Sequence, residues 1–516
     1  MKRFLSVALV LVMLLAAMPM AAFAEYDYPY AGDSYGVDFD QASTVFEEGD
    51  VIALFGDSIT HGSTKGTHVN TSWFVQLEYY LATRYPALRV KTKNFGIGGI
   101  RTFEVADIQI PKGAYEGREF NKAIVYLGTN DGNQTYSRAS VTSAYTTVLD
   151  FIMTTRGAKP IALITPVGID LVTNPAYPNT YHNNDNMKKV CDEVIKTLGM
   201  QRGIPVAYQW DDFNATQVNA WEKHRIALMQ DQIHPSARGS SVTFATLIET
   251  LNLPGEVATV VVDAANGAVT KQGNCTVSDL VTSEGRVKYT YLANALPFAN
   301  TSYVQEGTDI MEYVEKFSRE TLKVEGLPSD TYSLIIDGFL IDTITAEELA
   351  EGVNLSLYNT PMVKQSKTVA DKLFTLTEKQ RYVNDIEYAL FHGRQTKYTG
   401  AMLDMYMKSM ASTTPHYKTY ADAVAVRTVD EWWAYLDTLW DDVYNAAQPT
   451  AHTIELVGAN APEEKVDEPT TPDTPTTPDT PHSFHLPSLI AWIAIGAAAV
   501  AAVVVVLVVL KKKKKA

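Results

Sequence analysis

The sequence predicts an α/β protein in which a parallel sheet with helices on both faces is followed by a β-rich module. From Val51 to about Pro254, short apolar runs alternate with stretches whose apolar residues recur every three or four positions. Such alternation of strands and helices is typical of a parallel sheet covered by helices. From Gly255 onward, short β-type runs follow one another across turn residues, which indicates a second, differently built module.

The elements of the first region follow in regular order. The predicted strands are Val51–Phe55, Arg89–Phe95, Lys122–Leu127, Pro160–Thr165 and Ile204–Ala207. The predicted helices are Trp73–Arg84, Ser140–Thr154, Asn186–Leu198, Gln217–Arg225 and Arg238–Leu251. Because ligand sites in open α/β sheets lie at the carboxyl ends of the strands, the loops after these strands are the expected place for chemistry.

The second region reads as a β-rich accessory module at 255–360 and a helical segment at 361–460. Its predicted strands are Val257–Val262, Val287–Leu292, Leu322–Val324 and Thr331–Ile341, the last with a hairpin turn at Gly338. Helical apolar spacing recurs in Val369–Leu390 and Val429–Tyr444. Trp433 and Trp440 follow this spacing, so we expect them in a core rather than stacked on sugar rings.

Both ends of the chain carry targeting patterns. Residues 1–24 combine Lys2 and Arg3, an apolar run and Ala22-Phe23-Ala24, which is typical of a signal peptide, so the first domain spans 25–254 with an N-terminal arm. Residues 461–488 form a Pro/Thr-rich linker, 489–510 an apolar run of transmembrane length and 511–516 a lysine-rich tail. Because lysines favour the cytoplasmic side, we expect the body at the extracellular face of the cell membrane, on a single C-terminal anchor.

Charge and cysteine content narrow the classes of partner. The 516 residues carry a formal net charge of −16, which argues against nucleic acid and anionic lipid as partners, so membrane contact is expected through the C-terminal helix only. Cys191 and Cys275, the only cysteines, could form one disulfide, and the sequence leaves their state and the oligomeric state open. The following histidines lack metal-ligand spacing: His61, His68, His182 and His224.

Four polar stretches fall after predicted strands or near the end of the first region. They are Gly56-Asp57-Ser58, Asn94–Gly99, Gly128–Asp131 and Asp231–His234. Ser58 is a candidate nucleophile, and the alternative is that it only caps the helix that follows. Asp57 is expected to form structural hydrogen bonds. His61 could line the pocket, but it is rather expected to be a solvated loop residue.

Ester hydrolysis by serine needs a base, a carboxylate that orients the base, and donors for the oxyanion. Asp231 and His234, three residues apart, can place a carboxylate against one ring nitrogen while the other nitrogen faces Ser58. The Gly99 N–H and the Asn130 side-chain amide can join the Ser58 N–H as oxyanion donors. Removing one such donor typically costs about 3–4 kcal/mol of transition-state stabilisation.

In order and spacing, these stretches resemble the conserved blocks of the SGNH (GDSL-type) hydrolases over about Val51 to Leu253, with Gly-Asp-Ser-Ile in place of Gly-Asp-Ser-Leu. The resemblance implies a flavodoxin-like three-layer domain with a five-stranded parallel sheet. It also implies Ser58 as nucleophile, His234 as base, Asp231 as its orienting acid, and an oxyanion hole made by Ser58, Gly99 and Asn130. The mechanism requires no cofactor and no metal.

The expected function is that of an extracellular serine esterase. It would hydrolyse acyl esters, with O-acetyl esters on a carbohydrate as the leading expectation, so its partner is an acylated small molecule or polysaccharide. Two alternatives are a lipid esterase of the same family and a non-enzymatic surface carbohydrate-binding protein on the same scaffold. The polar loop Thr165–Asn186 is the expected source of substrate contacts, and the residues that could stack on a sugar, or simply pack, are Tyr177, Tyr181 and Trp210.

Overall fold

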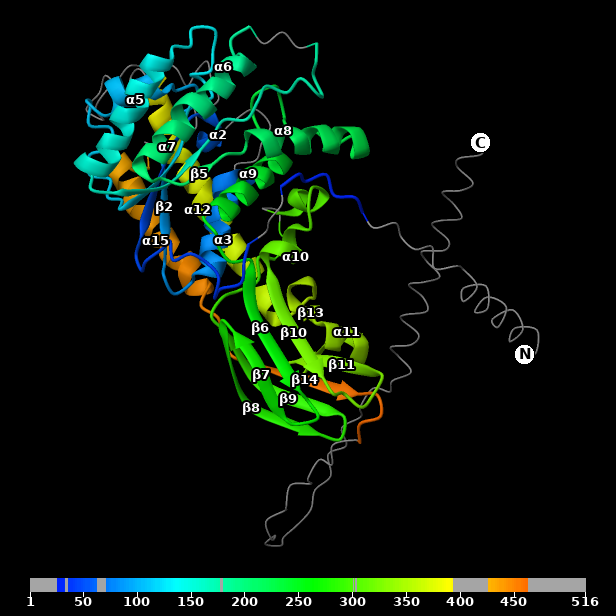
Figure 1. Cartoon of the computed structure of the whole chain (residues 1–516). Coiled ribbons are helices and arrows are strands. Elements are labelled where there is room, and N and C mark those ends of the chain that lie inside the picture. The colour runs from blue at the N-terminus through cyan, green and yellow to red at the C-terminus, as the bar shows by residue number, and fades with distance from the viewer. Residues whose placement is uncertain are drawn as a thin grey trace, which may run out of the picture. The chain divides into compact units, whose positions relative to one another are not determined.

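The computed structural model describes residues 26–32, 36–62, 71–176, 180–299, 301, 304–392 and 426–462. The predicted signal peptide, transmembrane helix and lysine tail lie outside these residues, as does the linker from residue 463 onward. All described residues belong to one compact unit, Met1–Pro462 (Figure 1). Within the described ranges, no helix combines the length and the apolar character needed to cross a bilayer.

The first sheet confirms the predicted five parallel strands. Its order is β2-β1-β3-β4-β5, and every neighbouring pair is parallel. The strands are β1 Val51–Gly56, β2 Lys91–Asn94, β3 Lys122–Tyr126, β4 Lys159–Ile164 and β5 Val206–Ala207. The strand order reverses between β1 and β3, and this is the point at which doubly wound sheets bind their ligands. The loops that carry Ser58 and Asn130 leave the sheet there.

Two groups of helices accompany this sheet. The helices are α2 Ser58–His61, α3 Trp73–Arg84, α4 Thr102–Glu104, α5 Arg138–Asp150, α6 Asn184–Lys189, α7 Lys196–Arg202, α8 Trp210–Asn219 and α9 Ala237–Thr250. Helix α3 contacts α9, whereas α5 contacts the π-helical turn Val190–Ile195 between α6 and α7. Every residue of α3 is buried, because α9 and a helix from the second region, α12, both contact it.

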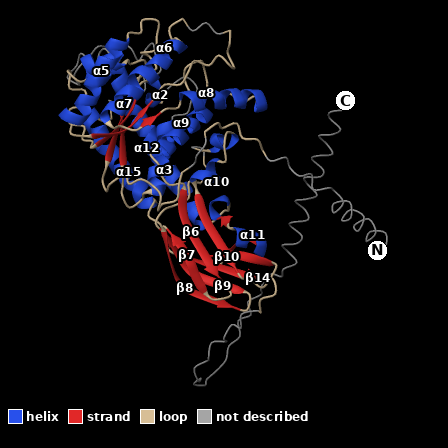
Figure 2. Ribbon diagram, in the orientation of Figure 1, coloured by secondary structure: helices blue, strands red, loops and turns tan. Residues whose placement is uncertain are grey.

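The second region consists largely of strands (Figure 2), and these form two further sheets. One has the order β13-β10-β6-β7 and the other β12-β11-β14-β9-β8, and their buried faces share one core. The strands are β6 Glu256–Asp263, β7 Ala268–Gly273, β8 Cys275–Ser283, β9 Arg286–Ala293, β10 Arg319–Glu325, β11 Thr331–Ile336, β12 Phe339–Thr345, β13 Val353–Asn354 and β14 His452–Gly458. Short helices α10 (Tyr313–Phe317) and α11 (Ala346–Glu351) accompany them. Asp337 and Gly338, both at positive φ, form the turn between β11 and β12, which confirms the predicted hairpin.

The prediction for the range 361–460 was wrong in one respect. It contains the expected helices, α12 Pro361–His392 and α15 Val429–Ala446, but also β14, which lies between β11 and β9 in the middle of a sheet. The chain therefore leaves the β-rich second region, called the lobe below, after β13 and returns through β14 to complete it. The two helices share the core of the first sheet, and Trp433 and Trp440 are buried in it, as predicted.

Direct hydrogen bonds connect the first region to the lobe. Arg84, buried in α3, donates to the main-chain oxygens of Glu256 at the start of β6 and of Phe317 at the end of α10. Tyr80 donates to the Pro254 oxygen at 2.8 Å. A buried guanidinium needs such acceptors, so these contacts fix α3 against the lobe. Cys191 and Cys275 are both free thiols.

Candidate active site

Ser58 is the first residue of α2, directly after β1. Asp57 is the N-cap of this helix, and its Oδ1 accepts the Ile59 N–H at 3.0 Å. The capping role considered for Ser58 therefore belongs to its neighbour, and the half-buried Ser58 hydroxyl is left for another partner. A side chain at Gly56 would collide with Thr60, so the tight turn that presents Ser58 requires glycine.

Ser58, His234 and Asp231 form a continuous hydrogen-bonded chain. The Ser58 Oγ lies 2.9 Å from His234 Nε2, and His234 Nδ1 lies 2.8 Å from Asp231 Oδ2. Because a carboxylate only accepts, Nδ1 carries the ring proton, and Nε2 is then free to accept the Ser58 proton. Asp231 Oδ1 accepts the N–H groups of Ile233 and His234 at 2.7 and 2.8 Å, which fixes the carboxylate.

The carboxylate of Asp231 is held in its ionised form. Burial alone would raise its pKa, but the hydrogen bond and charge of His234 and the two main-chain N–H groups outweigh burial and lower the pKa to about 2. Asp57 behaves in the opposite way. It is fully buried, and burial raises its pKa to about 6 against the hydrogen bonds from Ile59 and Thr129. The environment of these two groups thus assigns the ring-orienting position to Asp231 and a structural position to Asp57.

Asp131 links the loops after β2 and β3. Its Oδ2 accepts from the Thr102 N–H at 3.0 Å and from the Thr102 hydroxyl at 2.8 Å. Asn130, next to it, donates from Nδ2 to the Ile100 oxygen at 3.1 Å. Gly99 lies in the same turn, at a φ of 79° that disfavours any other residue. The structure therefore brings Asn130 to the turn that contains Gly99, and their role as oxyanion donors stays a prediction.

His61 was expected in a solvated loop, and this expectation was wrong. The residue is buried, with 3% of its surface exposed, because α12 covers it. Its Nε2 lies 3.1 Å from the Asn384 oxygen, and its ring contacts the Tyr388 ring. Sequence reasoning could not find this partner, since no local pattern connects two positions so far apart.

Of the residues considered for stacking on a sugar, Trp210 is buried among Met187, Cys191 and Ile169 and belongs to a core. Tyr181 is 47% exposed and its ring meets that of His182. Tyr177 lies outside the described residues. The neighbouring His182 was set aside for lack of metal-ligand spacing, yet its Nε2 lies 3.3 Å from Asn130 Oδ1. It is the site residue that sequence reasoning missed.

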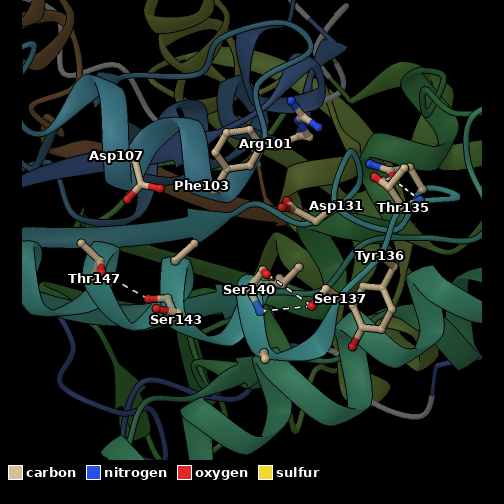
Figure 3. A pocket seen from close by; sticks show the side chains of 14 residues that line it. Arg101, Phe103, Asp107, Asp131, Thr135, Tyr136, Ser137, Ser140, Ser143 and Thr147 are labelled. Atoms are coloured by element: carbon tan, nitrogen blue, oxygen red, sulfur yellow. Dashed lines mark hydrogen bonds between the residues drawn. The ribbon is translucent and has the colours of Figure 1, made fainter.

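A pocket of about 670 Å³ opens beside the loops that carry Gly99 and Asn130 (Figure 3). Its walls combine hydroxyl groups of α5 and the preceding loop with the side chains of Arg101, Asp107 and Asp131. The hydroxyl-bearing residues are Thr135, Tyr136, Ser137, Ser140, Ser143 and Thr147. Polar groups that converge on a cavity of this size suit a polar ligand.

Comparison with known proteins identifies a matching family model and similar solved structures. Residues 54–242 match the family model of the GDSL-like lipase/acylhydrolase family. The solved structure of BT4096, a gut microbial diltiazem-metabolizing enzyme, is similar with a TM-score of 0.66 and 21% identity, over 81% of this chain and 99% of that chain. No curated protein sequence matches the chain. The likeness to BT4096 shows a shared fold that extends beyond the matched domain.

Two smaller structures match a shorter part of the chain. A lipase/acylhydrolase from Enterococcus faecalis is 19% identical over 39% of this chain and 95% of that chain, with a TM-score of 0.29. An acetyl-xylooligosaccharide esterase from Geobacillus is 17% identical over 40% of this chain and 95% of that chain, with a TM-score of 0.31.

Proposed function

We propose that this protein, which is a serine ester hydrolase because residues 54–242 are a GDSL-like lipase/acylhydrolase domain, removes short acyl groups, foremost O-acetyl groups, from a carbohydrate. The observation that carries the proposal is the unbroken hydrogen-bonded chain from Asp231 through His234 to the Ser58 hydroxyl. A surface protein that only bound carbohydrate would have no need for this alignment.

The reaction follows from the geometry. His234 Nε2 takes the proton of Ser58 Oγ as the oxygen attacks the ester carbonyl, and Asp231 stabilises the imidazolium that forms. The N–H groups of Ser58 and Gly99 and the amide of Asn130 would receive the negative charge on the carbonyl oxygen. The imidazolium then protonates the departing alcohol. Water, deprotonated by the same ring, hydrolyses the acyl-Ser58 ester and releases the carboxylic acid.

The polar pocket supports a hydroxyl-rich alcohol over a lipid. Sugar hydroxyls can exchange hydrogen bonds with the Ser137 and Ser140 hydroxyls, with the Asn133 amide and with the carboxylates of Asp107 and Asp131. A long acyl chain offers no hydrogen bonds to these groups, and it would lie against a polar rather than an apolar wall. A lipid esterase is therefore the less favoured candidate.

The proposed place of action is the extracellular face of the cell membrane. Its support is the signal-peptide pattern at 1–24 and the apolar run at 489–510 with the lysines that follow. Protease treatment of intact cells tests this point: cleavage of the catalytic region without lysis supports it, and full protection contradicts it.

The decisive experiment compares the wild-type protein with Ser58→Ala. We expect the wild type to release acetate from acetylated polysaccharide, to hydrolyse p-nitrophenyl acetate faster than p-nitrophenyl palmitate, and to be labelled by a fluorophosphonate. Ser58→Ala should lose all three properties. Preference for the palmitate ester would select the lipid esterase, and absence of labelling together with retained polysaccharide binding would select a binding protein.

A further inference from the structure

His182 is held over the loop after β3 by the main chain. The Asn183 N–H donates to the Gly132 oxygen at 2.9 Å, and the Gln134 N–H donates to the Tyr181 oxygen at 3.1 Å. An isolated antiparallel bridge pairs Asn133 with His182. Because main-chain bonds flank His182 on both sides, its position relative to Asn130 is built into the fold.

The contact between the side chains of His182 and Asn130 determines which ring nitrogen of His182 carries the proton. His182 Nε2 is 3.3 Å from Asn130 Oδ1, and a carboxamide oxygen only accepts, so Nε2 must carry hydrogen. On the other side of the carboxamide, Nδ2 donates to the Ile100 oxygen at 3.1 Å. The oxygen and the nitrogen of Asn130 each have a partner, and this fixes which way the amide faces.

The charge state of His182 suits this role. Burial, followed by the nearby charge of His234, lowers the pKa of His182 to about 4. The ring is therefore neutral at pH 7 and donates its hydrogen without placing a second positive charge beside His234. A charged ring there would oppose the formation of the His234 imidazolium.

We propose that His182 is a positioning residue that locks the carboxamide of Asn130 with its N–H group, rather than its oxygen, facing the reacting carbonyl. Nδ2 carries two hydrogens, and among the described residues only the Ile100 oxygen accepts one of them. The second hydrogen remains for the oxyanion. If the amide turned over, Oδ1 would face the developing negative charge and oppose it. The inference rests on the proposed function, since it assigns a task within that reaction.

A double-mutant cycle tests the proposal with p-nitrophenyl acetate as substrate, a small ester that offers no sugar to contact. We expect His182→Ala to lower kcat about 10-fold to 100-fold, less than the roughly 10²–10³-fold expected for loss of the donor in Asn130→Ala. KM should change less than about twofold. In the Asn130→Ala background, His182→Ala should cost nothing further, because its effect passes through Asn130 alone.

A conservative variant and a matched control complete the test. His182→Gln keeps a side-chain N–H that can donate to Asn130, so it should recover most of kcat. His224→Ala, at a half-buried histidine whose Nε2 lies 2.7 Å from the Asp27 oxygen, should leave kcat unchanged. Fluorophosphonate titration counts the folded sites, so every kcat refers to active protein.

Three outcomes would overturn the proposal. They are additive losses in the double variant, an effect confined to KM, and a failure of His182→Gln to recover kcat in folded protein. If His182→Ala does not fold, His182→Leu, which also lacks a donor but fills more of the space, gives the same test with and without Asn130→Ala. Failure of the proposed function is separate, because there the wild type itself would show no turnover that depends on Ser58.

Discussion

The Nε2 atom of His61 lies 3.1 Å from the main-chain oxygen of Asn384, although 323 positions separate the two residues. His61 ends the short helix that begins with Ser58, and Asn384 lies in α12. One turn further along α12, the Tyr388 ring lies so close to Gly98 that a Cβ there would be 2.9 Å away. Helix α12 thus supports both α2 and the turn that contains Gly99.

Removing this contact should weaken both the fold and the reaction. We expect His61→Leu to lower the free energy of unfolding by about 1–3 kcal/mol, because the Asn384 oxygen would lose a buried donor. We also expect a lower kcat on every ester, since the support of Ser58 changes but no substrate contact does. Thermal unfolding and p-nitrophenyl acetate turnover measure the two effects. Lys372→Ala, exposed on the same helix, should change neither, and an unaffected His61→Leu would remove α12 from the description of the site.

Asp57 directly precedes Ser58, and Asp231 contacts the His234 ring. One substitution at each aspartate distinguishes their roles. Asp231→Asn should lower kcat by about 10⁴-fold, because the amide no longer holds the His234 tautomer that accepts at Nε2. Asp57→Asn should lower it less than about 10-fold, because the amide oxygen can still accept the Ile59 N–H that Asp57 now accepts. Steady-state kinetics of both variants at pH 7 provide the comparison. Equal losses would contradict the assignment of Asp231 as the orienting acid.

The local sequence pattern was enough to predict features that are formed by residues close together in the chain. The strand before Ser58, the turn at Gly338 and the Asp231–His234 pair each depend on neighbouring residues, and the structure contains all three. Strands β7 and β8 were missed because most of their side chains are exposed, so they lack the apolar runs that indicate a strand.

Remote partners account for the rest of what the sequence did not predict. Strand β14 pairs with segments more than a hundred residues earlier in the chain. His61 and His182 acquire their environment from Asn384 and Asn130, at 323 and 52 positions away. A single histidine carries no sign of such a partner, and only the folded chain supplies it.

The buried carboxyl group of Glu78, which lies outside the active site, should make the stability of the protein depend on pH. It is buried in α3 and accepts a hydrogen bond from the Thr92 hydroxyl, and burial raises its pKa from 4.5 to about 8. Because the folded-state pKa is above the unfolded value, the protonated Glu78 carboxyl makes its full contribution to stability below about pH 4.5. As the pH rises to about 8, the free energy of unfolding falls, by at most about 1.4 kcal/mol per pH unit.

Glu78→Gln should remove this dependence, because the amide keeps the shape of the side chain and has no proton to lose. In urea unfolding at pH 5 and pH 9, we expect the variant to be more stable than the wild type at pH 9 and similar to it at pH 5. Glu119→Gln, whose carboxylate is 87% exposed, serves as the control and should follow the wild type. Parallel curves for Glu78→Gln and the wild type would contradict the raised pKa.

The lobe and the catalytic region should unfold together, and Leu456 in β14 provides the test. The side chain is fully buried between β11 and β9, so Leu456→Ala should cost about 2–5 kcal/mol of unfolding free energy. Arg84 joins α3 to the lobe, and α12 places Met362, near its start, in the core of the lobe and continues into the core of the first sheet. The temperature at which esterase activity is lost should therefore fall together with the unfolding temperature. Thr453→Ala, whose side chain is exposed on the same strand, should shift neither. Activity that outlasts a separate, earlier unfolding step would show that the lobe is not part of the catalytic unit.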